Sequence, residues 1–286
     1  MTGDLWQALI LLGLVGFLAM TYLVRVAVRG RAKFDRVEKQ GGSKLLSKEV
    51  MEMAYWGVQP LGKLLVFLRI TPNQVSWSSL VFAILAGACL SVGHFGFGAV
   101  FATISAFLDS LDGIVARLTG KASDAGEVLD AAVDRYSEFL FLGGLAIYYR
   151  EIPVLLGLSL LALMGSFMVS YSSAKAEALQ VSAPSGSMRR PERAVYLILG
   201  ALLSPLTIPI FETDRPYSIA MGHPMVIALC LVAVLANVSA VERLWAIAKA
   251  IRVREAEERR LAMAQAEESA ELEADTVSSQ RGRELT

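Results

Sequence analysis

The sequence has few cysteines and few charged residues, and both shortages narrow the class of protein. Its two cysteines among 286 residues, Cys89 and Cys230, lie in apolar stretches without a CxxC motif, so neither zinc binding nor a disulfide framework is expected. Charged residues make up 19% and hydrophobic residues 55%, with a mean hydropathy of +0.51, which is too apolar for an ordinary soluble domain. The net charge is zero, so no nucleic-acid-binding surface is indicated. We therefore expect an all-α protein that spans a bilayer several times.

Seven long hydrophobic runs are the main feature that the sequence does contain. A helix needs about 20 apolar residues to cross the hydrocarbon core of a bilayer, and each run approaches that length. The first is expected to be a retained transmembrane helix, because positive charges follow it and no small-residue cleavage site intervenes. The predicted spans are Leu5–Val28, Thr71–Val92, Phe97–Leu118, Ala125–Tyr149, Pro153–Ala176, Ala194–Phe211 and Pro224–Ile247.

The segment between the first two spans has a different pattern. Its apolar residues from Leu46 to Leu68 recur at mostly helical spacing with charged residues opposite them, which predicts an interfacial amphipathic helix that Pro60 should break. A buried helix of a soluble protein is the alternative interpretation. The next span should begin at Thr71, a good N-cap residue, with Pro72 in the first helical turn.

Basic residues are distributed unevenly among the loops. They cluster after the first, third, fifth and seventh spans, whereas the loops on the other side carry only Arg150 and Arg215. Cytoplasmic loops of membrane proteins are enriched in lysine and arginine. The pattern therefore predicts a protein of a bacterial-type inner membrane, with its N-terminus outside the cell membrane and its C-terminus in the cytoplasm.

Four aspartates stand out in the third and fourth spans. Asp109 and Asp112 are three residues apart, and Asp130 and Asp134 are four apart, so each pair projects from one helical face. The short turn between the spans should bring both faces together. Four carboxylates would repel one another without cations, and an all-oxygen site suits Mg²⁺ or Mn²⁺ better than zinc. The pattern therefore predicts a metal site that can act on a diphosphate.

The same segment resembles the signature of the CDP-alcohol phosphotransferase family. Residues 109–134 match D-x2-D-G-x2-A-R-x8-G-x3-D-x3-D without a departure, at eight fixed positions over 26 residues. The resemblance implies a membrane enzyme, usually a homodimer, that transfers a phosphatidyl group from CDP-diacylglycerol to an alcohol and releases CMP. The roles that it implies are metal binding by Asp109, Asp112, Asp130 and Asp134 with two ions, general-base catalysis by Asp134, and nucleotide binding by Gly113, Ala116, Arg117 and Gly126.

The resemblance also divides the chain into four parts. It extends over about Leu45 to Ile247 and implies a catalytic domain of six transmembrane helices over residues 70–250. Residues 1–30 are then an extra transmembrane helix, and residues 31–69 are a cytoplasmic linker with the interfacial helix. Residues 251–286 form a charged cytoplasmic tail that is expected to be helical and then disordered.

The acceptor alcohol has to be inferred from residues outside the aspartate motif. Lys175, Arg193 and Arg243 fall on the predicted cytoplasmic side, and three cations beside the metal would suit a phosphorylated acceptor. They resemble the lysine and two arginines with which phosphatidylinositol phosphate synthases hold inositol phosphate. Phosphatidylglycerophosphate synthase and phosphatidylserine synthase stay open as alternatives, and so does a purely topological role for these charges.

A transporter is the alternative from a different class, because membrane-embedded carboxylates also occur in ion pathways. Against it, all four acids fall near one end of two helices. The second half of the chain also has no matching cluster, which an inverted repeat would require. Release of CMP from CDP-diacylglycerol, measured with and without Mg²⁺, would separate an enzyme from a transporter.

Overall fold

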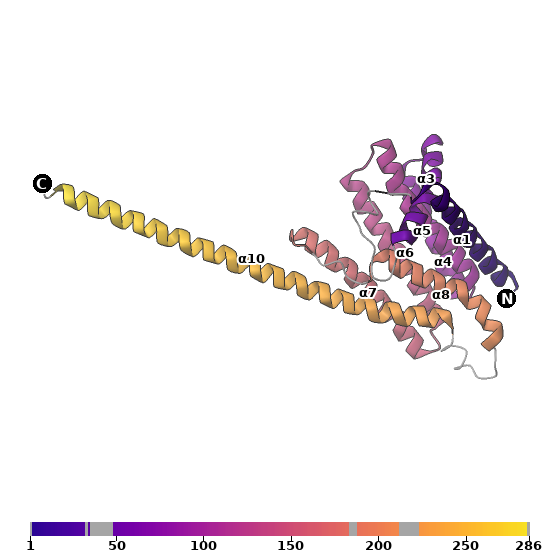
Figure 1. Ribbon diagram of the computed structural model, residues 1–286. Helices are drawn as coiled ribbons and strands as arrows, with labels where there is room; N and C mark the ends of the chain where they lie inside the picture. Colours follow the sequence, from indigo (N-terminus) through magenta and orange to yellow (C-terminus); the bar gives the residue numbers. More distant parts are fainter. Residues whose placement is uncertain (1, 32–33, 35–47, 183–187, 212–222, 285–286) are drawn as a thin grey trace. The chain divides into compact units, whose positions relative to one another are not determined.

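The computed structural model describes residues 2–31, 34, 48–182, 188–211 and 223–284, and every regular element in these residues is an α-helix (Figure 1). Each of the seven predicted spans corresponds to one helix, and α3 is the helix predicted between the first two spans. The helices are α1 (Thr2–Arg29), α3 (Lys48–Phe67), α4 (Pro72–Ser91), α5 (Phe95–Thr119), α6 (Asp124–Tyr148), α7 (Pro153–Ala178), α8 (Arg190–Phe211) and α10 (Pro224–Glu284). The fold is that of an all-α polytopic membrane protein, as predicted.

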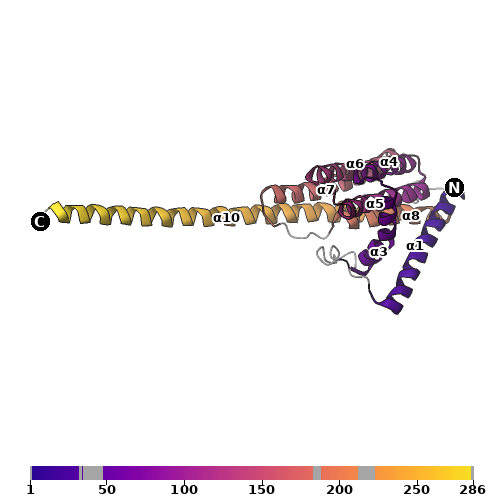
Figure 2. The ribbon, with the colours of Figure 1, turned by 90° about the horizontal axis from the view of Figure 1, so that it is seen from above.

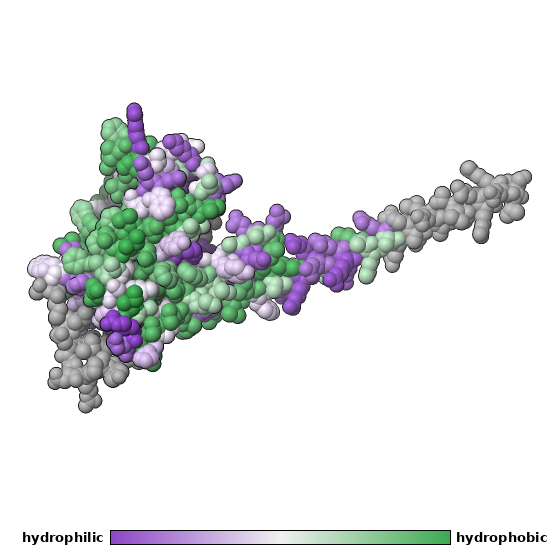
Figure 3. Space-filling view, turned by 180° about the vertical axis from the view of Figure 1, so that it is seen from behind, coloured by the Kyte–Doolittle hydropathy of each residue, from purple (hydrophilic) through white to green (hydrophobic). Residues whose placement is uncertain are grey.

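The chain divides into two compact units. The first comprises Met1–Tyr171 and Ser185–Ala240, and the second comprises Ser172–Pro184 and Val241–Thr286. All residues of the aspartate motif belong to the first unit. Five helices of the described chain are long and apolar enough to cross a membrane, namely α1, α4, α5, α7 and the part of α10 up to Ala266. Figure 3 shows one face of the molecule, on which large areas of hydrophobic side chains are exposed.

Helices α4, α5 and α6 pack closely in the first unit (Figures 1 and 2). The backbones of α4 and α6 touch, because a Cβ atom at Gly87 would collide with the carbonyl group of Leu140 and one at Gly144 with that of Gly87. Small residues permit such close approach between membrane helices. Helix α4 also starts as predicted, since Thr71 and Gln74 exchange side-chain to backbone hydrogen bonds in a capping box.

Helix α3 runs through Pro60, so the prediction that this proline breaks the helix was wrong. A proline inside a helix removes a backbone hydrogen bond and costs about 3 kcal/mol. Packing on both sides of Pro60 offsets this cost. Val58 lies in a small core with Leu111 and Ile114 of α5, and Gly62 leaves room for the Ile114 side chain.

Helix α1 docks on α5 through polar contacts as well as apolar ones. The Asp4 carboxylate accepts a hydrogen bond from the Phe97 backbone N–H at 3.1 Å and lies 3.4 Å from His94 Nδ1. His94 is the N-cap residue of α5 but makes no side-chain cap. Asp4 therefore caps α5 from a neighbouring helix. Nearer the other end of α1, the Tyr22 hydroxyl donates to the Glu52 carboxylate of α3 at 3.4 Å.

Candidate active site

The aspartate motif occupies the end of α5, the following turn and the start of α6. Gly120 ends α5 in a left-handed conformation with φ of 65°, which favours glycine. Ser123 begins α6 by accepting a hydrogen bond from the Gly126 backbone N–H at 3.2 Å. This short connection brings Asp109 of α5 beside Asp130 and Asp134 of α6.

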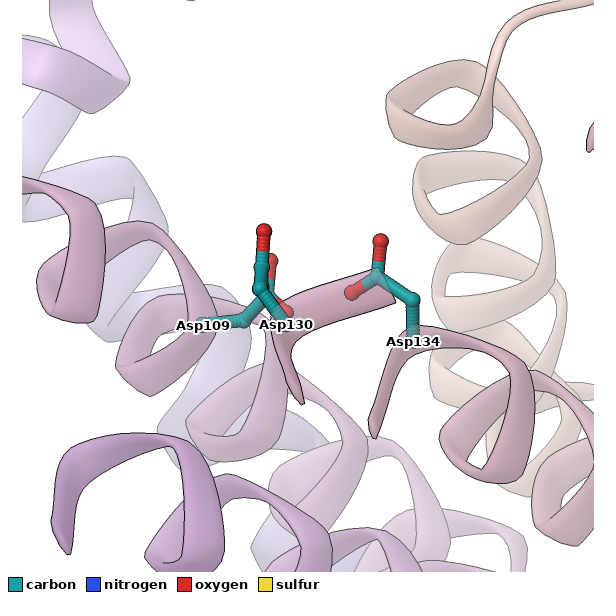
Figure 4. Close-up of side chains that lie close together, drawn as sticks. All are labelled: Asp109, Asp130 and Asp134. Carbon is teal, nitrogen blue, oxygen red and sulfur yellow. The ribbon is translucent and has the colours of Figure 1, made fainter. Parts of the chain in front are cut away.

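Three of the four predicted metal ligands lie together. Asp109, Asp130 and Asp134 each offer a carboxylate oxygen, and these oxygens lie within 4.8 Å of one another. In Figure 4 the carboxylates of Asp109 and Asp130 lie side by side and that of Asp134 faces them. Asp112 lies outside this group. Its carboxylate is buried and accepts a hydrogen bond of 2.6 Å from the Ser76 hydroxyl of α4.

These carboxylates fit a divalent metal. Their oxygens can converge on one ion, and the group contains neither histidine nor thiol, so the ligand set is hard and anionic. Asp109, Asp130 and Asp134 would hold Mg²⁺ or Mn²⁺. The charge of Asp112 interacts with those of Asp130 and Asp109 and adds to the negative potential at the site. The binding of two ions, with Asp112 as a further ligand, stays a prediction.

Arg190, the first residue of α8, contacts the same carboxylates. Its two terminal nitrogens donate to the two oxygens of Asp109 at 2.9 Å each, and it also forms an ion pair with Asp134. Charge-assisted pairs of this two-bond geometry are among the strongest polar contacts in proteins. Arg190 is one of the basic residues that follow the fifth predicted span, and it was not among the predicted site residues. No helical spacing links residue 190 to residues 109 or 134, so the sequence contains no local signal for this contact.

Arg193, a predicted acceptor-binding residue, lies in a buried ion pair. Its guanidinium is 1% exposed and lies 2.7 Å from the Glu138 carboxylate of α6, with a further hydrogen bond of 3.1 Å to the Met188 carbonyl. Sequence reasoning missed Glu138. Its position four residues after Asp134, on the same helical face, was the available signal.

The other two predicted acceptor-binding residues, Lys175 and Arg243, belong to the second unit. There the Arg243 guanidinium donates to the Ser173 hydroxyl at 2.7 Å. The convergence of Lys175, Arg193 and Arg243 on one acceptor stays a prediction.

The residues predicted to bind the nucleotide flank the carboxylates. Gly113, Ala116 and Arg117 follow Asp109 on α5 at intervals of four, seven and eight residues, which places them on one helical face. Gly113, Ala116 and Gly126 are half-buried and Arg117 is exposed. The nucleotide-binding role of these residues stays a prediction.

A cavity adjoins the carboxylates between α4, α5, α6 and α8. Its charged lining consists of Asp134, Glu138 and Arg190. The remaining lining is mostly apolar and comes from Ala83, Ala86, Ala102, Ala106, Phe141, Ala194, Leu197 and Ile198, together with the polar Ser105 and Ser137. Charged and apolar surface therefore meet beside the metal ligands, as the binding of an amphipathic substrate requires.

The fold and the site together define a polytopic membrane protein with a carboxylate cluster that suits a divalent metal. A family model described as CDP-alcohol phosphatidyltransferase matches residues 69–241, and the chain belongs to this family. The matched region contains the whole aspartate motif and leaves out α1, α3 and the part of α10 after residue 241.

Similar proteins agree with this assignment. The phosphatidylinositol phosphate synthase of Corynebacterium glutamicum is 31% identical over 58% of this chain and 78% of its own length. The archaetidylinositol phosphate synthase of Pyrococcus horikoshii is 34% identical over 54% of this chain and 81% of its own. The crystal structure of Mycobacterium tuberculosis phosphatidylinositol phosphate synthase with CDP-DAG bound has a TM-score of 0.57 at 26% identity, covering 66% of this chain and 92% of that one. The same protein with manganese and citrate gives a TM-score of 0.57 at 26% identity, covering 66% and 88% of the two chains.

Proposed function

We propose that this enzyme transfers the phosphatidyl group of CDP-diacylglycerol to a hydroxyl group of inositol phosphate and releases CMP. The observation that carries the proposal is the convergence of three carboxylate oxygens within 4.8 Å beside the guanidinium of Arg190. Such a site combines metal ligands with a group that can bind phosphate. The names of the relatives, which are synthases of inositol phosphate lipids, support this acceptor.

In the proposed reaction the acceptor oxygen attacks the phosphorus that carries the diacylglycerol group. The new P–O bond forms as the bond between that phosphorus and the bridging oxygen breaks, and CMP leaves with the bridging oxygen. We assign the removal of the hydroxyl proton to Asp134, since an alcohol is a weak nucleophile at neutral pH. A divalent metal, which Asp109, Asp130 and Asp134 would hold, would neutralise charge on the diphosphate.

We assign the acceptor phosphate to Arg190 in preference to Arg193 among the arginines of α8. The Arg190 side chain is 32% exposed and lines the cavity, whereas that of Arg193 is 1% exposed and paired with Glu138. Lys175 and Arg243 stay proposed partners of the same phosphate.

We further propose that the enzyme lies in a bacterial-type inner membrane, with its site facing the cytoplasm and its N-terminus outside. We also propose that it is a homodimer. The basic loops support the orientation, and the family resemblance supports the dimer. Protease treatment of sealed inside-out vesicles should remove the C-terminal tail and leave α1 protected. Protection of the tail would contradict this orientation.

The acceptor can be identified directly. Purified enzyme receives labelled CDP-diacylglycerol with inositol phosphate, glycerol phosphate, serine or free inositol in parallel reactions, and the lipid products are identified. Of the four acceptors, only inositol phosphate should give a lipid product. This product should form in the presence of Mg²⁺ or Mn²⁺ and should not form after chelation of the metal. A lipid product formed from glycerol phosphate or serine would show that the proposed acceptor is wrong, while the phosphatidyl transfer from CDP-diacylglycerol would still hold. Undiminished turnover after complete chelation would reject the metal mechanism.

A further inference from the structure

Glu138 lies at the centre of a buried ionic network next to the aspartates, and the family motif ends before it. Its side chain is 9% exposed, and each of its oxygens contacts a different arginine. Oε1 lies 2.7 Å from the Arg193 guanidinium, and Oε2 lies 3.3 Å from Arg135 Nη1. Glu138 therefore binds one arginine of α8 and one of its own helix.

The same arginines lie close to the predicted metal ligands. Arg135 lies 3.6 Å from Asp134, and Arg190 pairs with both Asp134 and Asp109. Arg193 is repelled by Arg135 and Arg190, and Glu138 is the acid that attracts it. The guanidinium groups of these three arginines therefore lie at or next to the aspartate cluster, with side-chain exposures of 31% for Arg135, 32% for Arg190 and 1% for Arg193. Each of these positive charges reduces the attraction of the cluster for a metal cation.

We propose that Glu138 is a positioning residue that keeps the aspartate cluster anionic by binding Arg135 and Arg193, so that Asp134 and its neighbours can bind a divalent cation. With Glu138 charged, the five acids of this region, Glu138 and Asp109, Asp112, Asp130 and Asp134, exceed the three arginines by two. Without the charge of Glu138, the excess of acids falls to one. Arg135 would then have Asp134 as its remaining acidic partner.

A purely mechanical role for the Glu138–Arg193 pair, as a link between α6 and α8, makes a different prediction. A buried ion pair can often be replaced by neutral side chains of similar size with little loss of stability, whereas removing one partner leaves an uncompensated charge. A mechanical link is lost in any variant that lacks either partner. An electrostatic role is lost with Glu138 and is regained when Arg193 is removed as well.

The test measures Mn²⁺ binding to the full-length protein in detergent by the loss of the free Mn²⁺ signal in electron paramagnetic resonance. Glu138→Gln keeps the shape and removes the charge, and should weaken Mn²⁺ binding about 10- to 100-fold, the usual effect of losing a residue that supports metal ligands. The double variant Glu138→Gln/Arg193→Met should return the affinity towards that of the unsubstituted protein. Arg193→Met alone should bind Mn²⁺ at least as tightly as the unsubstituted protein.

Unchanged binding in Glu138→Gln would overturn the inference. So would a double variant as weak as Glu138→Gln, or weaker binding in Arg193→Met. If Glu138→Gln does not fold, the double variant and Arg193→Met decide the question alone. The inference rests on the metal mechanism in the proposed function, and the two fail differently: absence of Mn²⁺ binding in the unsubstituted protein would reject the mechanism itself.

Discussion

Replacing Ser76 with alanine tests whether Asp112 belongs to the metal site. The Ser76 hydroxyl donates to the Asp112 carboxylate at 2.6 Å, and both side chains are buried. A hydrogen bond to a charged group contributes about 1.5–3 kcal/mol, which corresponds to about 10- to 100-fold in an equilibrium constant. If Asp112 binds metal, the Mg²⁺ concentration for half-maximal CMP release should rise by up to this factor in Ser76→Ala.

Ser78→Ala is the matched control. Ser78 lies on the same helix, is exposed and donates only to the Gln74 carbonyl of α4 among the hydrogen bonds of the described residues. Its replacement should leave the Mg²⁺ requirement unchanged. The reasoning is refuted if both variants shift equally, because the effect would then come from α4 and not from Asp112. It is also refuted if Ser76→Ala lowers the rate at saturating Mg²⁺ without changing the Mg²⁺ requirement.

Three further predictions follow from the contacts described above. Asp134→Asn should lower kcat for CMP release about 10²- to 10⁴-fold, the usual contribution of a general base. Binding of CDP-diacylglycerol, measured in a filter assay, should persist. Turnover near that of the unsubstituted enzyme would exclude Asp134 as the base. Arg190→Met should raise the KM for the acceptor more than the KM for CDP-diacylglycerol, and the reverse order would move the acceptor site elsewhere. Asp4→Ala should lower the thermal unfolding temperature in detergent, because losing an N-cap costs about 1 kcal/mol. Asp4→Asn can still cap α5 and should lower this temperature less. Equal shifts in the two variants would argue against capping.

The sequence was sufficient to predict features that depend on local spacing. Hydrophobic runs located the helices, and Thr71 followed by Pro72 located the start of α4. The intervals within the aspartate motif predicted that Asp109 and Asp130 would meet. These features follow from helical geometry and from a turn of a few residues, so they need no knowledge of the tertiary packing.

Contacts between distant helices could not be predicted in the same way. Arg190 and Asp109 are separated by 81 residues, and Arg193 and Glu138 by 55. Which long side chains meet across such separations depends on how α5, α6 and α8 pack. The helical conformation at Pro60 likewise depends on packing against α5, which outweighs a local preference.

The charges that interrupt α6 explain both its weak membrane signal and its function. Charged residues are costly within a bilayer unless they are paired, and paired ones usually mark a functional site. Like α3 and α8, α6 is not among the candidate spans of the described residues, and it carries Asp130, Asp134, Arg135 and Glu138. Helix α6 packs closely on α4 at Gly87, and arginines of α8 form ion pairs with its acids. These contacts surround the charges of α6 with protein in place of lipid. Two of the three converging carboxylates, those of Asp130 and Asp134, therefore come from a helix whose composition alone does not mark it as a membrane span.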